Sequence, residues 1–368
     1  MKSLFDQTEF AGLKLKNRFI RSATYDGVAD EGGHVTEELF QIYENLAKGG
    51  VGTIITGLTA VTDREQLSPG QMGIYDDSFI TEYKRLINVI HQHDTNIIVQ
   101  LASLGSQNSP SETTGKVVWG PSAVEDSNYK VTPQEMTLED ISFLQTAFAD
   151  AALRAQKAGF DGIQLHAAHG YLLSKFLTPY YNRRTDNYGG TIENRARMIF
   201  ETYQAIREKV GPTYPILIKI NSDDFMDDGM SFEECKYVCQ KLTALGINAV
   251  EISGGSPSSR LNEGVVRGIK APEQEEYFKR YAAEIGQEIH VPVIAVGGNR
   301  EFTSITKLIN ELPIEYIALS RPLICESDLI KRWQDGDMKS AKCVSCNKCF
   351  RRGGTLCIFN RRKQSAPQ

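Results

Sequence analysis

The sequence lacks any apolar stretch that approaches the roughly 18 residues needed to cross a membrane, and it lacks a strong net charge. Its net charge is −5, with 41% apolar and 24% charged residues. These values are ordinary for a globular enzyme, and they exclude a general polyanion binder and a disordered chain. We therefore expect a protein that binds neither nucleic acid nor membranes.

The amino-terminal residues, MKSLFDQTEFAGLKLKNRF, lack both a continuous apolar segment and a small-residue cleavage site. A secretory signal peptide would need both of these features. The chain also lacks an evenly spread set of cysteines, because four of its seven lie between Cys343 and Cys357. A secreted disulfide framework would distribute them more widely. We expect a cytoplasmic protein in a reducing compartment.

Short apolar runs alternate with helical stretches along the chain. Each run is largely continuous in apolar character, as a strand buried on both faces should be. The eight runs are residues 18–24, 52–58, 96–102, 162–168, 216–221, 249–253, 291–298 and 316–322. Capping-box patterns at Thr137–Asp140 and Ser231–Glu234 begin two of the helical stretches. Eight such units over roughly 300 residues predict a (β/α)8 TIM barrel rather than a doubly wound sheet.

The chain divides into a barrel and a short extension. We predict that residues 1–335 form a single barrel and that residues 336–368 form a cysteine-rich carboxy-terminal tail. Within the barrel, residues 105–136 follow the third strand, contain prolines and lack strong periodicity. Because functional loops of a barrel lie at the ends of its strands, we predict that this insertion is a lid or capping segment over the active face.

Polar residues gather where the predicted strands end, the face at which barrel enzymes carry out their chemistry. Lys219 and Gln100 lie inside strands that are otherwise apolar. A buried ammonium group is unfavourable unless it meets an anion or a strong acceptor. Two interpretations follow: an internal ion pair with a glutamate such as Glu251, or an anionic ligand at the barrel mouth.

Gly297, Gly298 and Arg321 follow the seventh and eighth predicted strands. Many barrels bind a phosphate group with these two loops, because paired glycines let backbone N–H groups approach the phosphate oxygens. An arginine adds a bidentate contact. The glycine pair alone is equally compatible with a simple turn. Together with Arg321 it predicts a phosphate site.

His166 and His169 stand at the end of the fourth predicted strand, and Tyr171 follows two residues later. A histidine pair without a third, carboxylate ligand is a weak metal signal. The two residues are also compatible with core histidines whose hydrogen bonds are satisfied. We favour a third interpretation, in which two imidazoles hold and polarise one carbonyl oxygen of a substrate. Tyr171 would then be the proton donor.

The tail carries Cys343, Cys346, Cys349 and Cys357 in a C-x2-C-x2-C-x7-C pattern. Four thiolates at this spacing can bind a tetrahedral zinc ion or a [4Fe–4S] cluster. Free thiols that stabilise a carboxy-terminal flap are the third alternative. The spacing alone does not separate the three.

The segment HAAHGYLLSKFLTPYYNRRTDNYGGTIENRARMIFE closely resembles the signature of the Old Yellow Enzyme family of FMN-dependent ene-reductases, also called NADH:flavin oxidoreductases. The segments LKNRFIRSATYDG, IIVQLASLGSQ, ILIKIN, VIAVGGN and YIALSRPLI resemble the family in order and spacing. The cysteine tail is similar to that of 2,4-dienoyl-CoA reductase-type members, where the cysteines ligate [4Fe–4S] at a longer spacing. The resemblance covers nearly the whole chain.

The resemblance implies a barrel that holds FMN non-covalently at its mouth. The family positions that would hold the cofactor are Ser22, Ala23, Thr24, Gly57, Gln100, Lys219, Gly297, Gly298 and Arg321. Among these, Gln100 would bond the pyrimidine edge of the ring and Lys219 would lie near N1/O2. The paired glycines and Arg321 would hold the phosphate.

The resemblance also implies a ping-pong reaction with NAD(P)H as electron donor and an α,β-unsaturated carbonyl compound as the small-molecule acceptor. His166 and His169 would bind the carbonyl oxygen, and Tyr171 would protonate the α-carbon. Tyr25 departs from the family, whose members often have a flavin-tuning cysteine or threonine there. Ser103 and Ser106 also depart, since some relatives carry histidine and arginine at those positions.

Two alternatives to an ene-reductase remain open on sequence grounds. One is a cluster-containing flavoprotein subunit that receives electrons from a separate electron-transfer protein. The other is a non-catalytic FMN-binding barrel, against which the joint presence of Lys219, His166, His169 and Tyr171 argues. For all three interpretations we expect a homo-oligomer.

Overall fold

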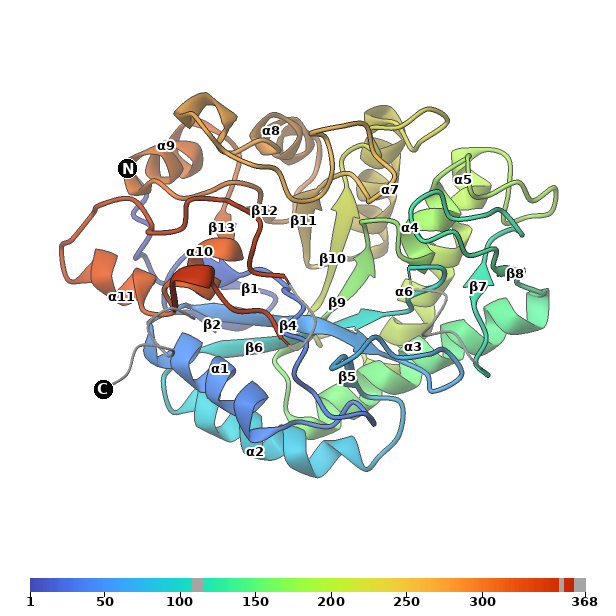
Figure 1. The fold of residues 1–368 in the computed structure, drawn as a ribbon, viewed down its shortest axis with the longest axis horizontal. Coiled ribbons are helices and arrows are strands. Elements are labelled where there is room, and N and C mark those ends of the chain that lie inside the picture. The colour runs from blue at the N-terminus through green and yellow to red at the C-terminus, as the bar shows by residue number, and fades with distance from the viewer. Residues whose placement is uncertain (108–114, 351–353, 361–368) are drawn as a thin grey trace.

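The computed structural model describes residues 1–107, 115–350 and 354–360. Parts of the predicted insertion and of the predicted tail therefore lie outside the described residues. At the centre of the molecule is a closed parallel barrel (Figure 1). Its strands are β3 (Phe19–Arg21), β4 (Thr53–Ala60), β6 (Asn96–Ala102), β9 (Gly162–Ala167), β10 (Ile216–Asn221), β11 (Ala249–Ser253), β12 (Val293–Ala295) and β13 (Tyr316–Leu319).

Neighbouring barrel strands follow chain order, and β13 pairs with β3 to close the ring. The helices lie around the strands (Figure 1). They are α1 (Glu37–Lys48), α2 (Phe79–His91), α3 (Leu138–Ala158), α4 (Leu172–Leu177), α5 (Ile192–Arg195), α6 (Arg197–Val210), α7 (Phe232–Leu245), α8 (Lys279–Glu288), α9 (Phe302–Glu311), α10 (Arg321–Cys325) and α11 (Leu329–Gln334). The predicted (β/α)8 TIM barrel is confirmed.

Local sequence signals place several helix ends where they were predicted. The Thr137–Asp140 and Ser231–Glu234 capping boxes begin α3 and α7, with both reciprocal hydrogen bonds present. Gly159 and Gly246 end the same helices at φ +95° and +96°. A residue with a Cβ is disfavoured there, so glycine sets the point at which each helix stops.

A short hairpin of β1 (Thr8–Phe10) and β2 (Leu13–Leu15) was not predicted. Its apolar side chains, among them Phe10 and Leu15, join a buried cluster with residues of the barrel strands. The ring of Phe10 lies edge-on to Tyr316, with centroids 5.6 Å apart. Three-residue strands are too short to show a period of two, which is why the sequence did not reveal them.

Three shorter strands, of two residues each, were also not predicted. β5 (Met72–Gly73) extends the sheet beside β4, and β7 (Trp119–Gly120) pairs with β8 (Gln134–Glu135) within the insertion. Among the described residues, no helix has the length and apolar character required to span a membrane.

Candidate active site

A cavity of about 420 Å³ opens at the carboxy-terminal ends of the barrel strands. Its size is typical of a cofactor or substrate site. The predicted site residues that line it are Ser22, Ala23, Thr24, Gln100, His166, His169, Tyr171, Lys219, Gly297, Gly298 and Arg321. Gly57 does not border it. Its N–H lies 2.9 Å from the Tyr43 hydroxyl, and its neighbour Leu58 forms the wall.

The two histidines meet because the chain turns sharply after β9. His169 has φ +66° and Gly170 has φ +79°, a left-handed conformation that is uncommon for a residue other than glycine. The His169 N–H donates to Asn221 Oδ1 at 3.1 Å, which fixes this turn. The imidazole centroids are 5.2 Å apart, and the ring of Tyr171 lies 4.6 Å from that of His166.

Both histidines are neutral near pH 7. Burial lowers the pKa of His166 to about 3, and the charge of Lys219 contributes. Burial also puts the pKa of His169 well below its usual value. His166 Nδ1 is buried and has no hydrogen-bond partner among the described residues, whereas His169 Nε2 lies 2.7 Å from Ser253 Oγ. Both imidazoles border the cavity, where a ring N–H can meet a ligand oxygen.

Tyr171 keeps its proton. Burial raises the pKa of its phenol, and the nearby phenols of Tyr129 and Tyr25 raise it further. A protonated phenol beside two neutral imidazoles gives the cavity three donor groups within a small space. Such a group can polarise a carbonyl oxygen and deliver a proton to an adjacent carbon.

Lys219 forms an internal ion pair with Glu251, which is one of the two arrangements predicted from the sequence. Its Nζ lies 3.1 Å from Glu251 Oε1 and donates to Ser22 Oγ at 2.8 Å. Lys219 also borders the cavity, so the ion pair and a cavity-facing role occur together rather than as alternatives. Glu251 extends the network on its other side, where it accepts a 2.8 Å hydrogen bond from Gln164 Nε2.

The predicted phosphate end of the cavity is built from glycines. Gly297 and Gly298 have φ +109° and +84°, and a Cβ on Gly297 would lie 2.7 Å from the rings of Tyr277 and Phe278. A larger residue therefore does not fit. Arg321 donates to the Arg267 carbonyl at 2.8 Å. Arg321 is also bonded by neutral oxygens of Asn347 and Tyr277, and within the described residues no carboxylate pairs with it.

A sequence model of the NADH:flavin oxidoreductase / NADH oxidase family matches residues 3–339. The chain belongs to this family. It is 33% identical over 348 residues to the NADH oxidase of Thermoanaerobacter brockii, an alignment that covers 94% of the chain and 53% of that protein. The chain thus spans about half the length of this curated relative.

Solved structures agree with the family assignment. A 2-naphthoyl-CoA reductase complex superposes with a TM-score of 0.86 at 26% identity, covering 94% of the chain and 54% of that protein. Old Yellow Enzyme from Pichia sp. superposes with a TM-score of 0.77 at 26% identity, covering 92% of the chain and 87% of that protein. The predicted membership of the Old Yellow Enzyme family is confirmed.

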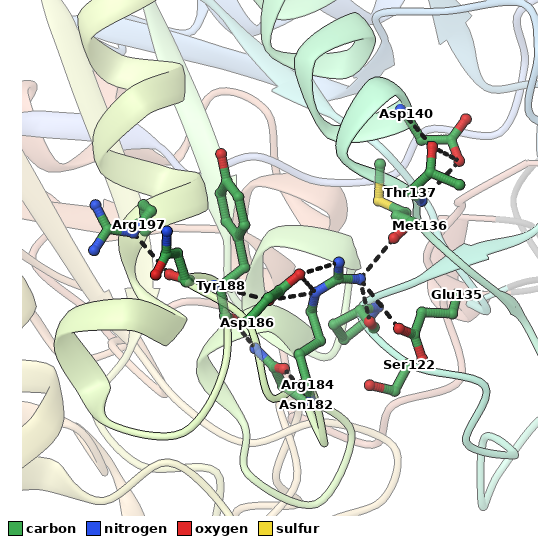
Figure 2. A network of polar contacts seen from close by, with 12 residues as sticks. Ser122, Glu135, Met136, Thr137, Asp140, Asn182, Arg184, Asp186, Tyr188 and Arg197 are labelled. Atoms are coloured by element: carbon green, nitrogen blue, oxygen red, sulfur yellow. Dashed lines mark hydrogen bonds and ion pairs between the residues drawn. The ribbon is translucent and has the colours of Figure 1, made fainter.

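The polar loop in the family signature anchors the insertion, a role that the sequence alone did not reveal. Arg184 donates to the carbonyls of Pro121 and Met136 at 3.0 and 2.6 Å, and Asp186 holds the guanidinium at 2.6 Å (Figure 2). Tyr129, from the insertion, borders the cavity. In this member of the NADH:flavin oxidoreductase family, the signature loop thus ties the insertion to the barrel.

A buried ion pair holds the insertion at a second point. Lys175 on α4 lies 2.5 Å from Asp126, and both side chains are almost fully buried. The Lys175 ammonium also contacts Ser106 and stacks over the ring of Tyr181 at 4.5 Å. Because α4 directly follows Tyr171, the insertion and the proposed proton donor are held by the same segment.

The cysteine tail packs against the barrel mouth. Ser345 and Phe350 border the main cavity, and Thr355 donates its N–H to the Asp26 carbonyl at 2.8 Å and its hydroxyl to the Tyr25 carbonyl at 2.6 Å. These contacts place the tail beside the first strand of the barrel.

Cys343, Cys346, Cys349 and Cys357 line one small cavity of about 20 Å³ beside α10. Burial raises the pKa of Cys343 and Cys349. Burial and the Cys357 thiol raise the pKa of Cys325 to about 12. Within the described part of the chain, no three His, Cys, Asp or Glu side chains are arranged to hold a metal ion. The predicted zinc or [4Fe–4S] ligation therefore stays a prediction.

Several cavity residues were not predicted from the sequence. They are Leu58, Tyr129, Val265, Val266, Tyr277, Phe278, Arg300, Ser345 and Phe350. Most come from loops, which carry no periodic signal. Arg300 had a usable signal, because it follows the Gly297–Gly298 pair within two residues.

Proposed function

We propose that the chain is an FMN-dependent NAD(P)H oxidoreductase that reduces the C=C bond of α,β-unsaturated carbonyl compounds. The observation that carries this proposal is the donor group of His166, His169 and Tyr171 on one wall of the cavity. Two neutral imidazoles beside a protonated phenol match a carbonyl oxygen and the carbon next to it.

The residues that line the cavity are compatible with both the phosphate and the ring of FMN. Gly297, Gly298 and Arg321 would hold the phosphate, since the glycines leave room and the arginine has no carboxylate partner among the described residues. Gln100 and Lys219 would face the pyrimidine edge of the ring, and Ser22, Ala23 and Thr24 would line the edge near N5. When bound, FMN supplies hydride transfer from NAD(P)H to the β-carbon of the substrate.

The histidines act on the oxygen of the substrate. Each neutral imidazole has one N–H, and two such donors would stabilise the negative charge that grows on the carbonyl oxygen as the C=C bond is reduced. Because both pKa values are depressed, the imidazoles remain neutral donors and do not protonate the substrate.

Tyr171 would supply the proton. Its phenol has a raised pKa, so it is fully protonated before the reaction. It would protonate the α-carbon, and the proton would then be restored from solvent. The product gains one hydride at the β-carbon and one proton at the α-carbon, which balances the reduction.

The second candidate function is a subunit that receives electrons from a separate protein through a cluster on the tail. Two observations favour it: the four tail cysteines line one small cavity, and Ser345 and Phe350 of the same tail border the main cavity. We also propose that the tail binds zinc if it holds no cluster, and that the chain forms a homo-oligomer.

One visible spectrum of anaerobically purified protein tests these proposals. We expect flavin absorbance that either NADH or NADPH bleaches and that a cyclic enone restores. Flavin that neither nucleotide bleaches, together with iron and acid-labile sulfide, would support the second candidate. Absence of flavin after FMN is added would refute both.

A further inference from the structure

Glu251 is a buried carboxylate that the proposed chemistry does not use. It lies on β11 directly beside Lys219 on β10, is fully buried, and does not itself border the cavity. Its two oxygens accept from Ser22 Oγ at 2.6 Å, Gln164 Nε2 at 2.8 Å and Lys219 Nζ at 3.1 Å. It therefore sits beneath two residues of the cavity wall and contacts both.

The first consequence concerns charge. Lys219 is the cation at this wall, and Glu251 lies close enough to offset much of its field. A ligand that meets Lys219 thus meets an ion pair rather than an isolated ammonium group. The site attracts an anion less strongly than the lysine alone would.

The second consequence concerns the orientation of two amides. An ionised carboxylate only accepts hydrogen bonds, so Gln164 must turn its Nε2 toward Glu251 and its Oε1 toward Gln100. Gln100 must then donate its own Nε2 to Gln164, at 2.8 Å. This leaves the Gln100 carbonyl oxygen as the acceptor that it can offer to a ligand in the cavity.

We propose that Glu251 is a positioning residue for the flavin ring. Through Gln164 it makes Gln100 an acceptor, which matches the single ring N–H on the pyrimidine edge of FMN. Through Lys219 it limits how strongly the site favours the reduced ring, which is an anion at N1. This inference rests on the proposed function, because it assumes that FMN occupies the cavity.

The charge consequence is tested with Glu251→Gln, by measuring the affinity for FMN in its oxidised state and the midpoint potential of the bound flavin. We expect the affinity for reduced FMN relative to oxidised FMN to rise about tenfold, or about 30 mV for a two-electron couple. Glu326→Gln is the control. Glu326 is also a buried carboxylate, but its ion-pair partners Arg332 and Lys342 do not border the main cavity, whereas Glu251 contacts Ser22 and Lys219 of the cavity wall. The control should leave this ratio unchanged.

A pair of variants at Lys219 keeps the test valid if Glu251→Gln does not fold. Lys219→Gln leaves Glu251 without its cation, and we expect the same ratio to fall about tenfold or more. The double variant Lys219→Gln/Glu251→Gln is neutral, and it should return the ratio to within about threefold of the wild type. A double variant that matches Lys219→Gln would overturn the inference.

The orientation consequence is tested with Gln164→Leu, which leaves the Lys219–Glu251 pair intact. Loss of the two hydrogen bonds that Gln164 makes, to Glu251 and from Gln100, should weaken FMN binding about fivefold in both redox states, without changing their ratio. If the wild type binds no FMN, the proposed function fails. If the wild type binds FMN but Glu251→Gln leaves the ratio unchanged and Gln164→Leu leaves binding unchanged, only the role of Glu251 fails.

Discussion

The barrel mouth and the cysteine tail both carry residues that can take part in chemistry, but they hold these residues in different ways. His166, His169 and Tyr171 are fixed by strand register, a strained turn and the hydrogen bond to Asn221. The tail cysteines share a small cavity, but the described residues contain no preformed metal site. Side chains at strand ends are preorganised by the barrel, whereas those on an irregular segment depend on what binds them.

The largest expected effect comes from breaking the buried ion pair that joins the insertion to α4. Lys175→Met leaves Asp126 buried without its partner, which should lower the free energy of unfolding by about 3–5 kcal/mol. Denaturant titration measures this loss. The double variant Lys175→Met/Asp126→Asn keeps an oxygen that can accept from the N–H groups of Asn128 and Tyr129, and it should recover most of the loss. A double variant as unstable as the single one would contradict this account.

Removing the proton donor should have the next largest effect. Tyr171→Phe should lower turnover of a cyclic enone by about 10²–10⁴-fold, the usual contribution of a general acid. Bleaching by NAD(P)H should be unaffected, because no proton from the phenol is needed in that half-reaction. Stopped-flow measurement separates the two. Tyr129→Phe, at another tyrosine of the cavity wall, is the control and should have little effect.

Removing one of the two imidazoles that would bind the carbonyl oxygen should lower activity by a somewhat smaller factor. His166→Ala deletes the imidazole whose Nδ1 has no partner in the described structure. We expect kcat/KM for the enone to fall about 10²–10³-fold, in line with the loss of one oxyanion donor. Unchanged kcat/KM would show that His166 is a core histidine after all.

The depressed histidine pKa values predict a pH effect on stability. In the unfolded chain His166 binds a proton as the pH falls through 6.5, but in the folded protein it does so only near 3. Stability from this residue is therefore complete above pH 6.5 and is lost between pH 6.5 and 3. His169, with its pKa also lowered, acts in the same direction. Denaturant titrations across this range should show a decline that is shallower in His166→Ala.

The smallest effect is expected in the tail. Cys346 is exposed, and Cys346→Ser should change enone turnover with NADPH by less than about twofold, as surface substitutions usually do. Iron and zinc content should be measured on the same samples. If Cys346→Ser lost both its bound metal and its turnover, the tail would contain a metal site required for activity. The tail and the barrel mouth would then no longer differ in this respect.

The sequence was most informative where polar residues lie at the ends of barrel strands. The barrel strands were visible as apolar runs, and their ends supplied the histidines, Lys219 and the glycine pair. Gly57 does not border the cavity, whose wall falls on the neighbouring Leu58, because successive residues of a strand point in opposite directions; its role in cofactor binding stays a prediction.

Loop residues could not be predicted in the same way. Tyr129, Tyr277 and Phe350 reach the cavity from irregular segments, whose course depends on tertiary contacts rather than on a local period. The hydrogen bonds of Gln164 are equally invisible in sequence. Its polarity suggests a partner, but only the barrel register brings that partner, Glu251, across two strands.

The segment from His166 to Asp186 combines two jobs in one stretch of chain. It supplies the donor group, and it contacts the insertion through Lys175 and through Arg184 (Figure 2). The donor residues and the contacts of the insertion therefore lie on one continuous stretch of chain. An engineer who grafts a new insertion to change substrate preference should move this stretch with it, since a foreign insertion would lose its anchors.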